Sequence, residues 1–295
     1  MHLSTHNWMR AETLETTLRR IKRLGFASIE ISGEPSQYDI ADTRRLLREY
    51  GIRCWGAVTL TLGERNLASA DEGLRARTVA YMQSVVRLAH DLGGSIATVV
   101  PATVGKLVPD ATPAQEWHWV VEGLREVYGL AERLGIRLAL EPLNRFETYF
   151  LNRGDQALAL ARQVGPNCGV CLDAFHLNIE EADMFAAIRD AGGRLADFHV
   201  ADNNRMAPGQ GAFDWKHVVA TLREAGYDGA LTVEFVAPID RTPANPYPDQ
   251  LETEPVDITP EQRKFIQDHG SSLLSEQFYT GLMAKSAQTL LPLIG

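Results

Sequence analysis

The segment RLALEPLNRFETYFLN, residues 137–152, decides how the rest of the chain is interpreted. Its first residues form an apolar run that predicts a buried strand, and this run ends on Glu141 and Pro142. Because proline cannot donate to a strand ladder, the strand is expected to stop there and to leave the Glu141 carboxylate at the rim of a sheet. A polar and aromatic loop follows, so this rim is the first candidate for a functional site.

Three later apolar runs also end near a side chain that can bind a metal ion. The run GVCLD ends on Asp173, LADFHV carries His199, and ALTVEF carries Glu234. Two Glu, one Asp and one His make a mostly oxygen ligand set, which suits Mn²⁺, Mg²⁺, Co²⁺ or Fe²⁺ better than a metal that prefers thiolates. Together with Glu141, these residues are predicted to form one metal site.

The alternation of strands and helices predicts the fold class. Strand-like apolar runs alternate with segments of helical spacing, several of which end at glycine. Eight such units in 295 residues predict an α/β fold, a (β/α)8 TIM barrel, with residues 1–295 as a single domain. The active site of a TIM barrel lies at the C-terminal ends of its strands, which is where the four candidate ligands fall. The strands are expected at residues 2–8, 28–32, 52–60, 95–101, 137–141, 169–173, 195–200 and 230–235.

The chain changes character after the eighth expected strand. Residues at about 236–270 are rich in proline and acidic side chains and have no clear period, and a final helix is expected at about 272–291. Because this irregular segment leaves the functional face of the barrel, it is interpreted as a lid or as a subunit contact, and both roles stay open.

Composition excludes several classes of partner. The net charge is −9 and the pI is about 5.4, with no cluster of Lys and Arg, so nucleic acid is not expected as a partner. No apolar run is long enough to cross a membrane, and MHLSTHNWMR lacks the pattern of a secretory signal. The odd number of cysteines, three, does not fit a disulfide framework, so a cytoplasmic location is expected.

Three stretches together are similar to a known family. EPLNRFETYFLN, LDAFHLNIEE and HVADNNRMAPGQGAFDW resemble the D-tagatose/D-psicose (ketose) 3-epimerases, within the larger group of xylose isomerase-like TIM barrels. The resemblance implies that the four ligands hold a divalent metal, Mn²⁺ before Mg²⁺, Co²⁺ or Fe²⁺. It also implies that Glu141 and Glu234 are the catalytic acid and base, on opposite faces of the sugar.

The same resemblance implies a set of substrate contacts. Residues at the family's substrate-binding positions are Glu147, His176 and Arg205. The family's aromatic residues on the first strand are replaced here by THNW, and within it His6 and Trp8 are expected to pack on the sugar. An arginine fork can hold substrate oxygens, and a histidine can donate to the carbonyl region.

The predicted function is a metal-dependent ketose 3-epimerase that acts on an unphosphorylated sugar. Such an enzyme removes a proton next to a carbonyl, through an enediolate stabilised by the metal, and returns a proton to the other face. The first alternative is the carbon-carbon-cleaving lyase subunit of a C-glycoside deglycosidase, which would act on 3-oxo-glycosides and need room for an aglycone. A hydroxypyruvate isomerase is a further alternative. The partners expected are a small sugar and a second copy of the chain, or a small subunit of another kind for the lyase.

Overall fold

The computed structural model describes the chain except for residues 238–241, 243, 245–249, 251–259, 261–273 and 295. Most of the irregular segment expected at 236–270, and the expected start of the final helix at residue 272, therefore lie outside the described residues. Both roles expected for this segment, a lid and a subunit contact, therefore stay predictions.

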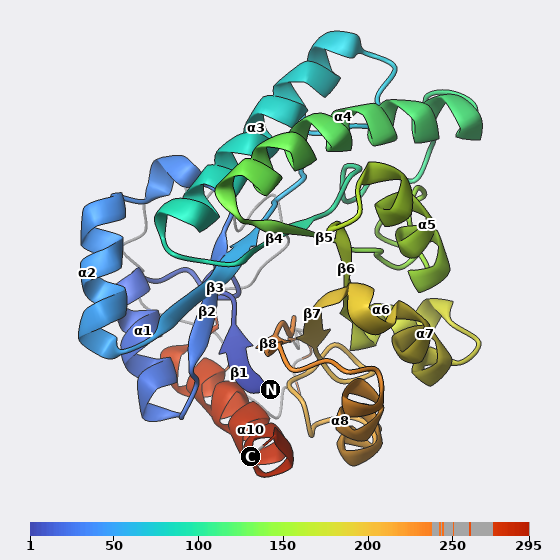
Figure 1. Cartoon of the computed structure of the whole chain (residues 1–295). Helices are drawn as coiled ribbons and strands as arrows, with labels where there is room; N and C mark the ends of the chain where they lie inside the picture. The colour runs from blue at the N-terminus through green and yellow to red at the C-terminus, as the bar shows by residue number, and fades with distance from the viewer. Residues whose placement is uncertain (238–241, 243, 245–249, 251–259, 261–273, 295) are drawn as a thin grey trace.

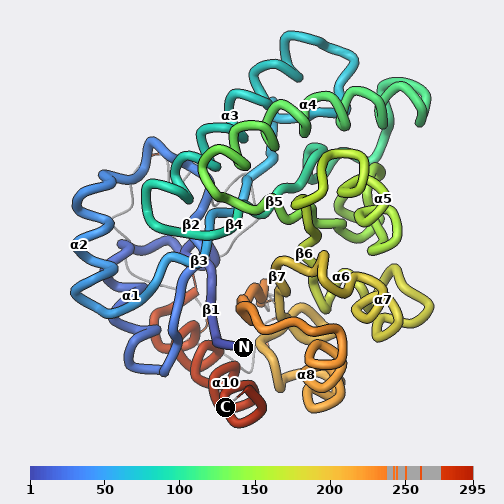
Figure 2. Tube along the Cα trace, in the orientation of Figure 1, coloured from blue at the N-terminus to red at the C-terminus, as the bar shows by residue number. Residues whose placement is uncertain are grey.

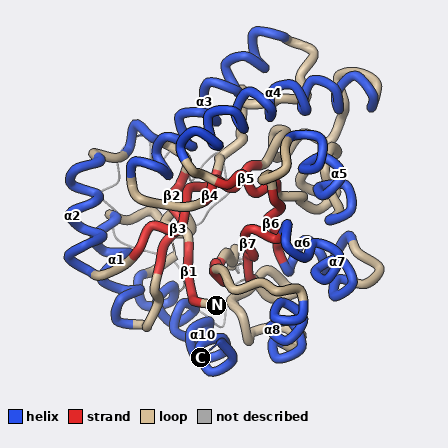
Figure 3. Tube along the Cα trace, viewed as in Figure 1, coloured by secondary structure: helices blue, strands red, loops and turns tan. Residues whose placement is uncertain are grey.

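Eight parallel strands form one sheet in the order β1-β8-β7-β6-β5-β4-β3-β2. A parallel bridge between His6 and Glu30 joins its two end strands, β1 and β2, so that the sheet is a nearly closed barrel. Figure 3 shows the strands inside a surrounding layer of helices, Figure 1 shows β8 beside β1, and Figure 2 traces the chain around the barrel from β1 to α10. The predicted TIM barrel fold is confirmed. The strands are β1 His2–Thr5, β2 Ser28–Ser32, β3 Arg53–Val58, β4 Ile96–Val99, β5 Arg137–Leu140, β6 Gly169–Asp173, β7 Leu195–Val200 and β8 Ala230–Val233.

Helices follow the strands in alternation and cover the outside of the barrel (Figure 1). The long helices α3 and α4 pack against each other, and the last helix, α10, packs against α8 and β1. The helices are α1 Leu14–Arg23, α2 Ile40–Tyr50, α3 Glu72–Asp91, α4 Pro113–Leu134, α5 Gly154–Val164, α6 Ala174–Glu180, α7 Met184–Ala191, α8 Trp215–Glu224 and α10 Glu276–Ile294, with 3-10 turns η1 Pro35–Gln37 and η2 Gly192–Arg194.

Local sequence explains where the helices begin and end. Helix α4 starts at a capping box in which the Thr112 side chain accepts from the Gln115 N–H, and Pro113 occupies the first turn. Gly135 ends α4 with a left-handed backbone, φ 68°, which a residue with a Cβ adopts only at a cost. The expected strand boundaries agree with the observed ones to within a few residues. Helix α6 was not expected from the sequence.

Strand register brings the candidate metal ligands to one rim of the barrel. Asp173 is paired with His199 across β6 and β7. Glu141 follows β5 directly and its N–H donates to the Val99 carbonyl at 3.0 Å, and the N–H of Glu234, which follows β8, donates to the Val200 carbonyl at 3.1 Å. The parallel strands thus place all four side chains at the C-terminal end of the barrel.

The barrel interior beneath this rim is polar. Because side chains alternate along a strand, Asp197 points to the same side of β7 as His199, two residues later. Glu30 on β2 accepts a hydrogen bond from Thr98 on β4 at 2.6 Å, and both side chains are fully buried. Buried acids of this kind are stable only when they are hydrogen-bonded, so the interior is organised around a polar network.

Two further expectations concern cysteines and membranes. Cys54, Cys168 and Cys171 are all buried and carry free thiols, as expected. No helix in the described part of the chain is long and apolar enough to cross a membrane.

Candidate active site

Glu141, Asp173, His199 and Glu234 converge at the C-terminal end of the barrel. One possible ligand atom from each of the four lies within 4.8 Å of those of the other three, and all four residues are buried. The Nδ1 atom of His199 is 3.0 Å from Glu141 Oε1 and 3.1 Å from Glu234 Oε2. Three carboxylates and one imidazole in this arrangement form a candidate site for a hard divalent cation.

Asp173 provides an independent test of whether this donor set fits a metal. Its Oδ1 atom accepts from the backbone N–H groups of Phe175 at 2.6 Å and His176 at 3.2 Å, so that the residue caps helix α6. Among the described residues, its Oδ2 atom is one of the few buried side-chain atoms that have no hydrogen-bond partner. A buried carboxylate oxygen without a donor is costly, and a cation shared with the other three side chains would satisfy it. The residues present therefore fit a divalent metal.

Burial and mutual repulsion shift the titration of the site. Burial raises the pKa of Glu141 to about 8 and the pKa of Asp173 to about 7. Burial would also raise the pKa of Glu234, but the charges of His199 and Arg205 hold it well below its usual value. Burial would lower the pKa of His199, yet the nearby Glu141 and Glu234 carboxylates help to raise it well above its usual value. The site thus retains protons that a divalent cation would displace.

Two acids on the far side of His199 were missed by the sequence analysis. The Nε2 atom of His199 is 3.2 Å from Glu30 Oε2 and 3.2 Å from Asp197 Oδ2. A ring whose Nδ1 lone pair binds a metal carries its proton on Nε2, so these acids accept that proton and fix the ring's orientation. A glutamate inside the otherwise apolar run SIEIS was the signal that could have identified Glu30.

A cavity of about 430 Å³, called here the metal-site cavity, opens on the ligands. Glu141 and Glu234 contribute to its wall, and this volume lies in the range of small-molecule pockets. The lining contains both apolar and polar side chains. The apolar part includes Val58, Leu60, Leu62, Val100, Leu143 and Phe175, and the polar part includes Glu147, His176 and Arg205.

The three predicted contact residues, Glu147, His176 and Arg205, lie together in this wall. His176 accepts at Nδ1 from Asn144, whose side-chain amide is 2.9 Å away and whose backbone N–H is 3.2 Å away. A neutral ring then carries its proton on Nε2, toward the cavity, and burial and Arg205 lower the pKa of His176 well below its usual value. Arg205 Nη1 lies 3.2 Å from that Nε2 and 3.6 Å from Glu147 Oε1.

Arg205 also has an unusual backbone. It is the one non-glycine residue with positive φ in the described part of the chain, at 62°. Its guanidinium lies over the Phe175 ring, 4.5 Å from the centroid, and its carbonyl accepts from the Val236 N–H. Strain of this kind costs about 1–3 kcal/mol and persists where surrounding contacts impose it, which is typical of functional sites.

His6 and Trp8 occupy different positions. Trp8 lines the metal-site cavity. His6 is fully buried and does not line it; its Nε2 atom is 3.6 Å from Glu234 Oε1, and its ring packs edge-on against His199, with centroids 4.8 Å apart. Burial lowers the pKa of His6 to about 4, so the ring is neutral near pH 7. His6 therefore lies behind the ligand Glu234, and a direct contact with substrate stays a prediction for Trp8 alone.

Comparison with known proteins agrees with the fold and the site. The family model described as "Xylose isomerase-like TIM barrel" matches residues 18–269. The chain therefore belongs to the xylose isomerase-like TIM barrel family.

Relatives in this family are sugar epimerases. The chain is 34% identical over 230 residues to a D-psicose 3-epimerase of Agrobacterium fabrum, which covers 74% of this chain and 77% of that protein. It is 28% identical over 250 residues to a 3-dehydro-D-guloside 4-epimerase of Escherichia coli, 81% of this chain and 93% of that protein. A solved D-allulose 3-epimerase from Methylomonas sp. superposes with a TM-score of 0.82 at 25% identity, covering 99% and 97% of the two chains. The predicted resemblance and the assignment of the chain as an isomerase-type enzyme are confirmed.

Proposed function

We propose that the chain is a divalent-metal-dependent ketose 3-epimerase that acts on an unphosphorylated sugar. The observation that carries this proposal is the buried carboxylate and imidazole set at the end of β5 to β8, in which Asp173 Oδ2 has no hydrogen-bond partner among the described residues. This set opens on a cavity whose polar wall includes Arg205 and His176. Ketose 3-epimerase relatives support the same reaction.

The metal would be held by Glu141, Asp173, His199 and Glu234. When bound, a divalent cation supplies a positive charge that stabilises negative charge developing on the substrate's carbonyl oxygen. Mn²⁺ is the proposed ion, because three carboxylates with one imidazole favour a hard or borderline cation.

Glu141 and Glu234 are the proposed acid and base. Epimerisation requires that one group remove the proton on the carbon next to the carbonyl and that another return a proton to the opposite face. The two carboxylates approach His199 Nδ1 from different strands, at 3.0 Å and 3.1 Å, and both line the metal-site cavity. Because the chemistry is symmetric, each carboxylate would serve as base in one direction and as acid in the other.

Arg205, His176 and Glu147 would orient the sugar. His176 Nε2 and Arg205 Nη1 lie 3.2 Å apart in one part of the cavity wall, where the remaining N–H groups of the guanidinium would donate to a substrate oxygen. Glu147 can accept from a hydroxyl nearby. The apolar residues of the lining, including Leu60 and Phe175, would exclude water from the reacting carbon.

The proposal is tested by incubating the Mn²⁺-loaded protein with D-fructose, D-tagatose and L-ribulose and resolving the products by chromatography. We expect the carbon-3 epimer of at least one free ketose. D-fructose 6-phosphate is the comparison for the unphosphorylated specificity and is expected to react more slowly. Absence of any epimer from a protein shown to contain one metal per chain would refute the proposal.

A second candidate keeps the same site and changes the substrate. The Escherichia coli relative is, by its name, an epimerase of a 3-dehydro-glycoside, and this chain spans 93% of its length. Epimerisation at carbon 4 of such a glycoside also begins with removal of a proton next to a ketone. The lyase alternative, which would release an aglycone from a 3-oxo-C-glycoside, begins with the same step, and release of free aglycone would distinguish it.

A further inference from the structure

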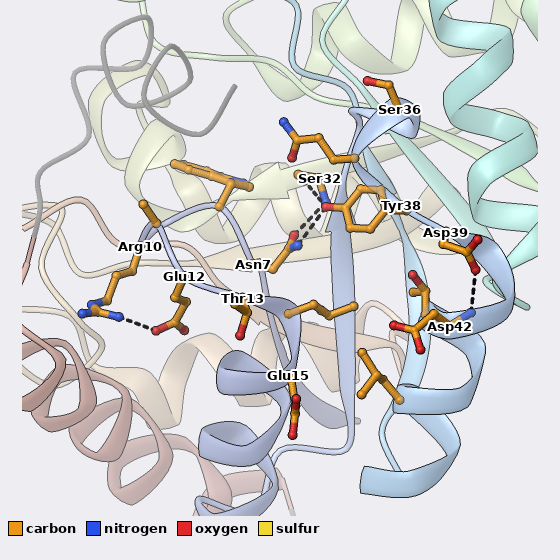
Figure 4. A pocket seen from close by; sticks show the side chains of 16 residues that line it. Asn7, Arg10, Glu12, Thr13, Glu15, Ser32, Ser36, Tyr38, Asp39 and Asp42 are labelled. Carbon is orange, nitrogen blue, oxygen red and sulfur yellow. Dashed lines mark hydrogen bonds and ion pairs between the residues drawn. The ribbon is translucent and has the colours of Figure 1, made fainter. Parts of the chain in front are cut away.

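A second hollow, called here the outer cavity, lies beside the metal-site cavity. It has a volume of about 580 Å³ and is bounded by the ends of β1 and β2 and the starts of α1 and α2 (Figure 4). Trp8 lines the outer cavity and the metal-site cavity alike. A ligand longer than one sugar ring could therefore occupy both hollows by passing this side chain.

The floor of the outer cavity is held in place by side-chain bonds between β1 and β2. The Asn7 side-chain amide donates to the Tyr38 hydroxyl at 2.8 Å, and its oxygen accepts from the Ser32 N–H at 2.8 Å. The Ser32 hydroxyl also bonds to the Tyr38 hydroxyl. Figure 4 shows these three side chains converging at the centre of the cavity. The surface is thus formed before any ligand arrives, which lowers the entropic cost of binding.

The lining suits a neutral ligand with many hydroxyl groups. Ser36 and Gln37 present a hydroxyl and an amide from an exposed turn, and Asp39 and Asp42 add carboxylates. Arg10, also in the lining, is paired with the neighbouring Glu12 at 2.6 Å. Because the arginine in the lining is already paired with a carboxylate, the outer cavity is poorly suited to a phosphate, whereas hydroxyl groups can donate to its carboxylates and accept from its amide.

We propose that the outer cavity binds a second sugar residue, joined by a glycosidic bond to the keto sugar that occupies the metal-site cavity. The substrate class is then a glycosylated keto sugar instead of a free monosaccharide. This inference rests on the proposed function, since it assigns the reacting keto sugar to Glu141 and Glu234. It adds a second binding site, the outer cavity, which none of the four metal ligands lines.

The first test compares two sugars with the same reacting end. D-fructose and isomaltulose, which is D-fructose with a glucosyl group on oxygen 6, are incubated with the Mn²⁺-loaded protein in D₂O, and deuterium at carbon 3 is followed by NMR. We expect kcat/KM for isomaltulose to exceed that for D-fructose by about tenfold or more. The 3-keto derivative of lactose and methyl 3-keto-β-D-galactopyranoside form a second pair for the keto-glycoside case, with deuterium followed at the carbons next to the ketone.

Two variants test whether the outer cavity causes the preference for the disaccharide. Gln37→Trp places a large side chain at the mouth of the outer cavity and is expected to lower the disaccharide-to-monosaccharide ratio by about fivefold or more. Arg44→Trp adds the same side chain to an exposed position of α2 that does not line the cavity, and it should leave the ratio unchanged. Saturation-transfer NMR does not require turnover. It should show transfer from the protein to the glucosyl ring of isomaltulose in wild type and none in Gln37→Trp.

The outcomes separate the two claims. Deuterium exchange with equal or lower efficiency for the disaccharides, and a ratio unaffected by Gln37→Trp, would overturn the glycosyl site while leaving the epimerase chemistry intact. No exchange in any of the four sugars, nor in D-tagatose and L-ribulose, with metal bound, would overturn the proposed function. Saturation transfer would then decide the glycosyl site alone. Transfer to the glucosyl ring in wild type that Gln37→Trp abolishes upholds the site, and absence of transfer in wild type overturns it.

Discussion

The Nε2 atom of His199 lies 3.2 Å from the Oε2 atom of Glu30, on the side of the ring that faces away from the ligand carboxylates. Both side chains are fully buried, and Thr98 holds the other oxygen of Glu30 at 2.6 Å. The imidazole, which belongs to β7, is therefore oriented by an acid from β2, a strand that is not adjacent to β7 in the barrel. Its Nδ1 atom is left to face Glu141 and Glu234.

Replacing Glu30 should weaken metal binding without removing a ligand. In Glu30→Gln the side chain keeps its size but loses its charge, so the Nε2–H of His199 loses one of its two carboxylate acceptors. We expect the Kd for Mn²⁺ to rise about 10- to 100-fold, as is typical of carboxylates that support a metal-binding histidine. Isothermal titration of the metal-free protein measures this change.

Glu116 provides the matched control for that experiment. It lies on α4 and is also buried, but it accepts from the backbone N–H groups of Asp110 at 2.7 Å and Ala111 at 3.2 Å and does not line the metal-site cavity. Glu116→Gln should lower the free energy of unfolding and leave the Kd for Mn²⁺ unchanged. Equal metal affinities in Glu30→Gln and wild type would contradict a supporting role for Glu30.

Metal affinity should depend on pH in a defined direction. Burial raises the pKa of Asp173 to about 7 and that of Glu141 to about 8 in the metal-free protein, so both carboxyls hold protons below these values. A metal must displace those protons, and the apparent affinity for Mn²⁺ should therefore rise from pH 6 to pH 8 and level off above. Titration calorimetry in two buffers of different ionisation enthalpy counts the protons released. A constant affinity over this range would refute the prediction.

The stability of the metal-free protein should follow the opposite trend. A carboxyl with a raised pKa binds its proton more tightly in the folded state than in the unfolded state, so its contribution to stability is lost as pH rises through the folded pKa. The Tm without metal is therefore expected to fall between pH 5 and pH 8, and Mn²⁺ should reverse the fall at pH 8. A double variant, Glu141→Gln with Asp173→Asn, should show a flatter dependence in the absence of metal.

Backbone strain at Arg205 predicts that two variants of this residue will differ in stability. Its φ of 62° favours glycine, while alanine at the same position retains the strain. Both Arg205→Gly and Arg205→Ala remove the guanidinium, and both should lower kcat/KM. We expect the Gly variant to be more stable than the Ala variant by about 1 kcal/mol in urea denaturation. A less stable Gly variant would show that the loop relaxes to negative φ when the side chain is removed.

The convergence of the four candidate metal ligands could be predicted from the sequence because each lies at or next to the C-terminal end of an apolar strand. Glu141 and Glu234 follow β5 and β8 directly, and the parallel topology alone then places them at one rim. Helix α6 was not predicted because it is only seven residues long and because its N-cap, Asp173, was already interpreted as a metal ligand. A capping role and a ligand role use different oxygens of one carboxylate, which a sequence pattern does not reveal.

The supporting residues required the three-dimensional structure. Glu30 and His199 are 169 positions apart, and a single acid in a strand gives no indication of its partner. His6 was expected to contact the sugar because it lies near the end of the first strand, yet the closure of β1 on β2 at His6 and Glu30 buries it behind Glu234. Barrel closure decides which end residues line the cavity, and it depends on strand register, which no local pattern specifies.

The central claim is that Glu141 and Glu234, with a divalent metal, exchange the proton on the carbon next to the substrate's carbonyl. The most direct measurement is proton NMR of a keto sugar in D₂O with the Mn²⁺-loaded protein, beside Glu234→Gln at matched metal content. The predicted result is loss of the carbon-3 proton signal and growth of the deuterated epimer in wild type, with a rate at least about 10²-fold lower in the variant. Exchange at an equal rate in Glu234→Gln, or none in the metal-loaded wild type with either free or glycosylated ketoses, would contradict it.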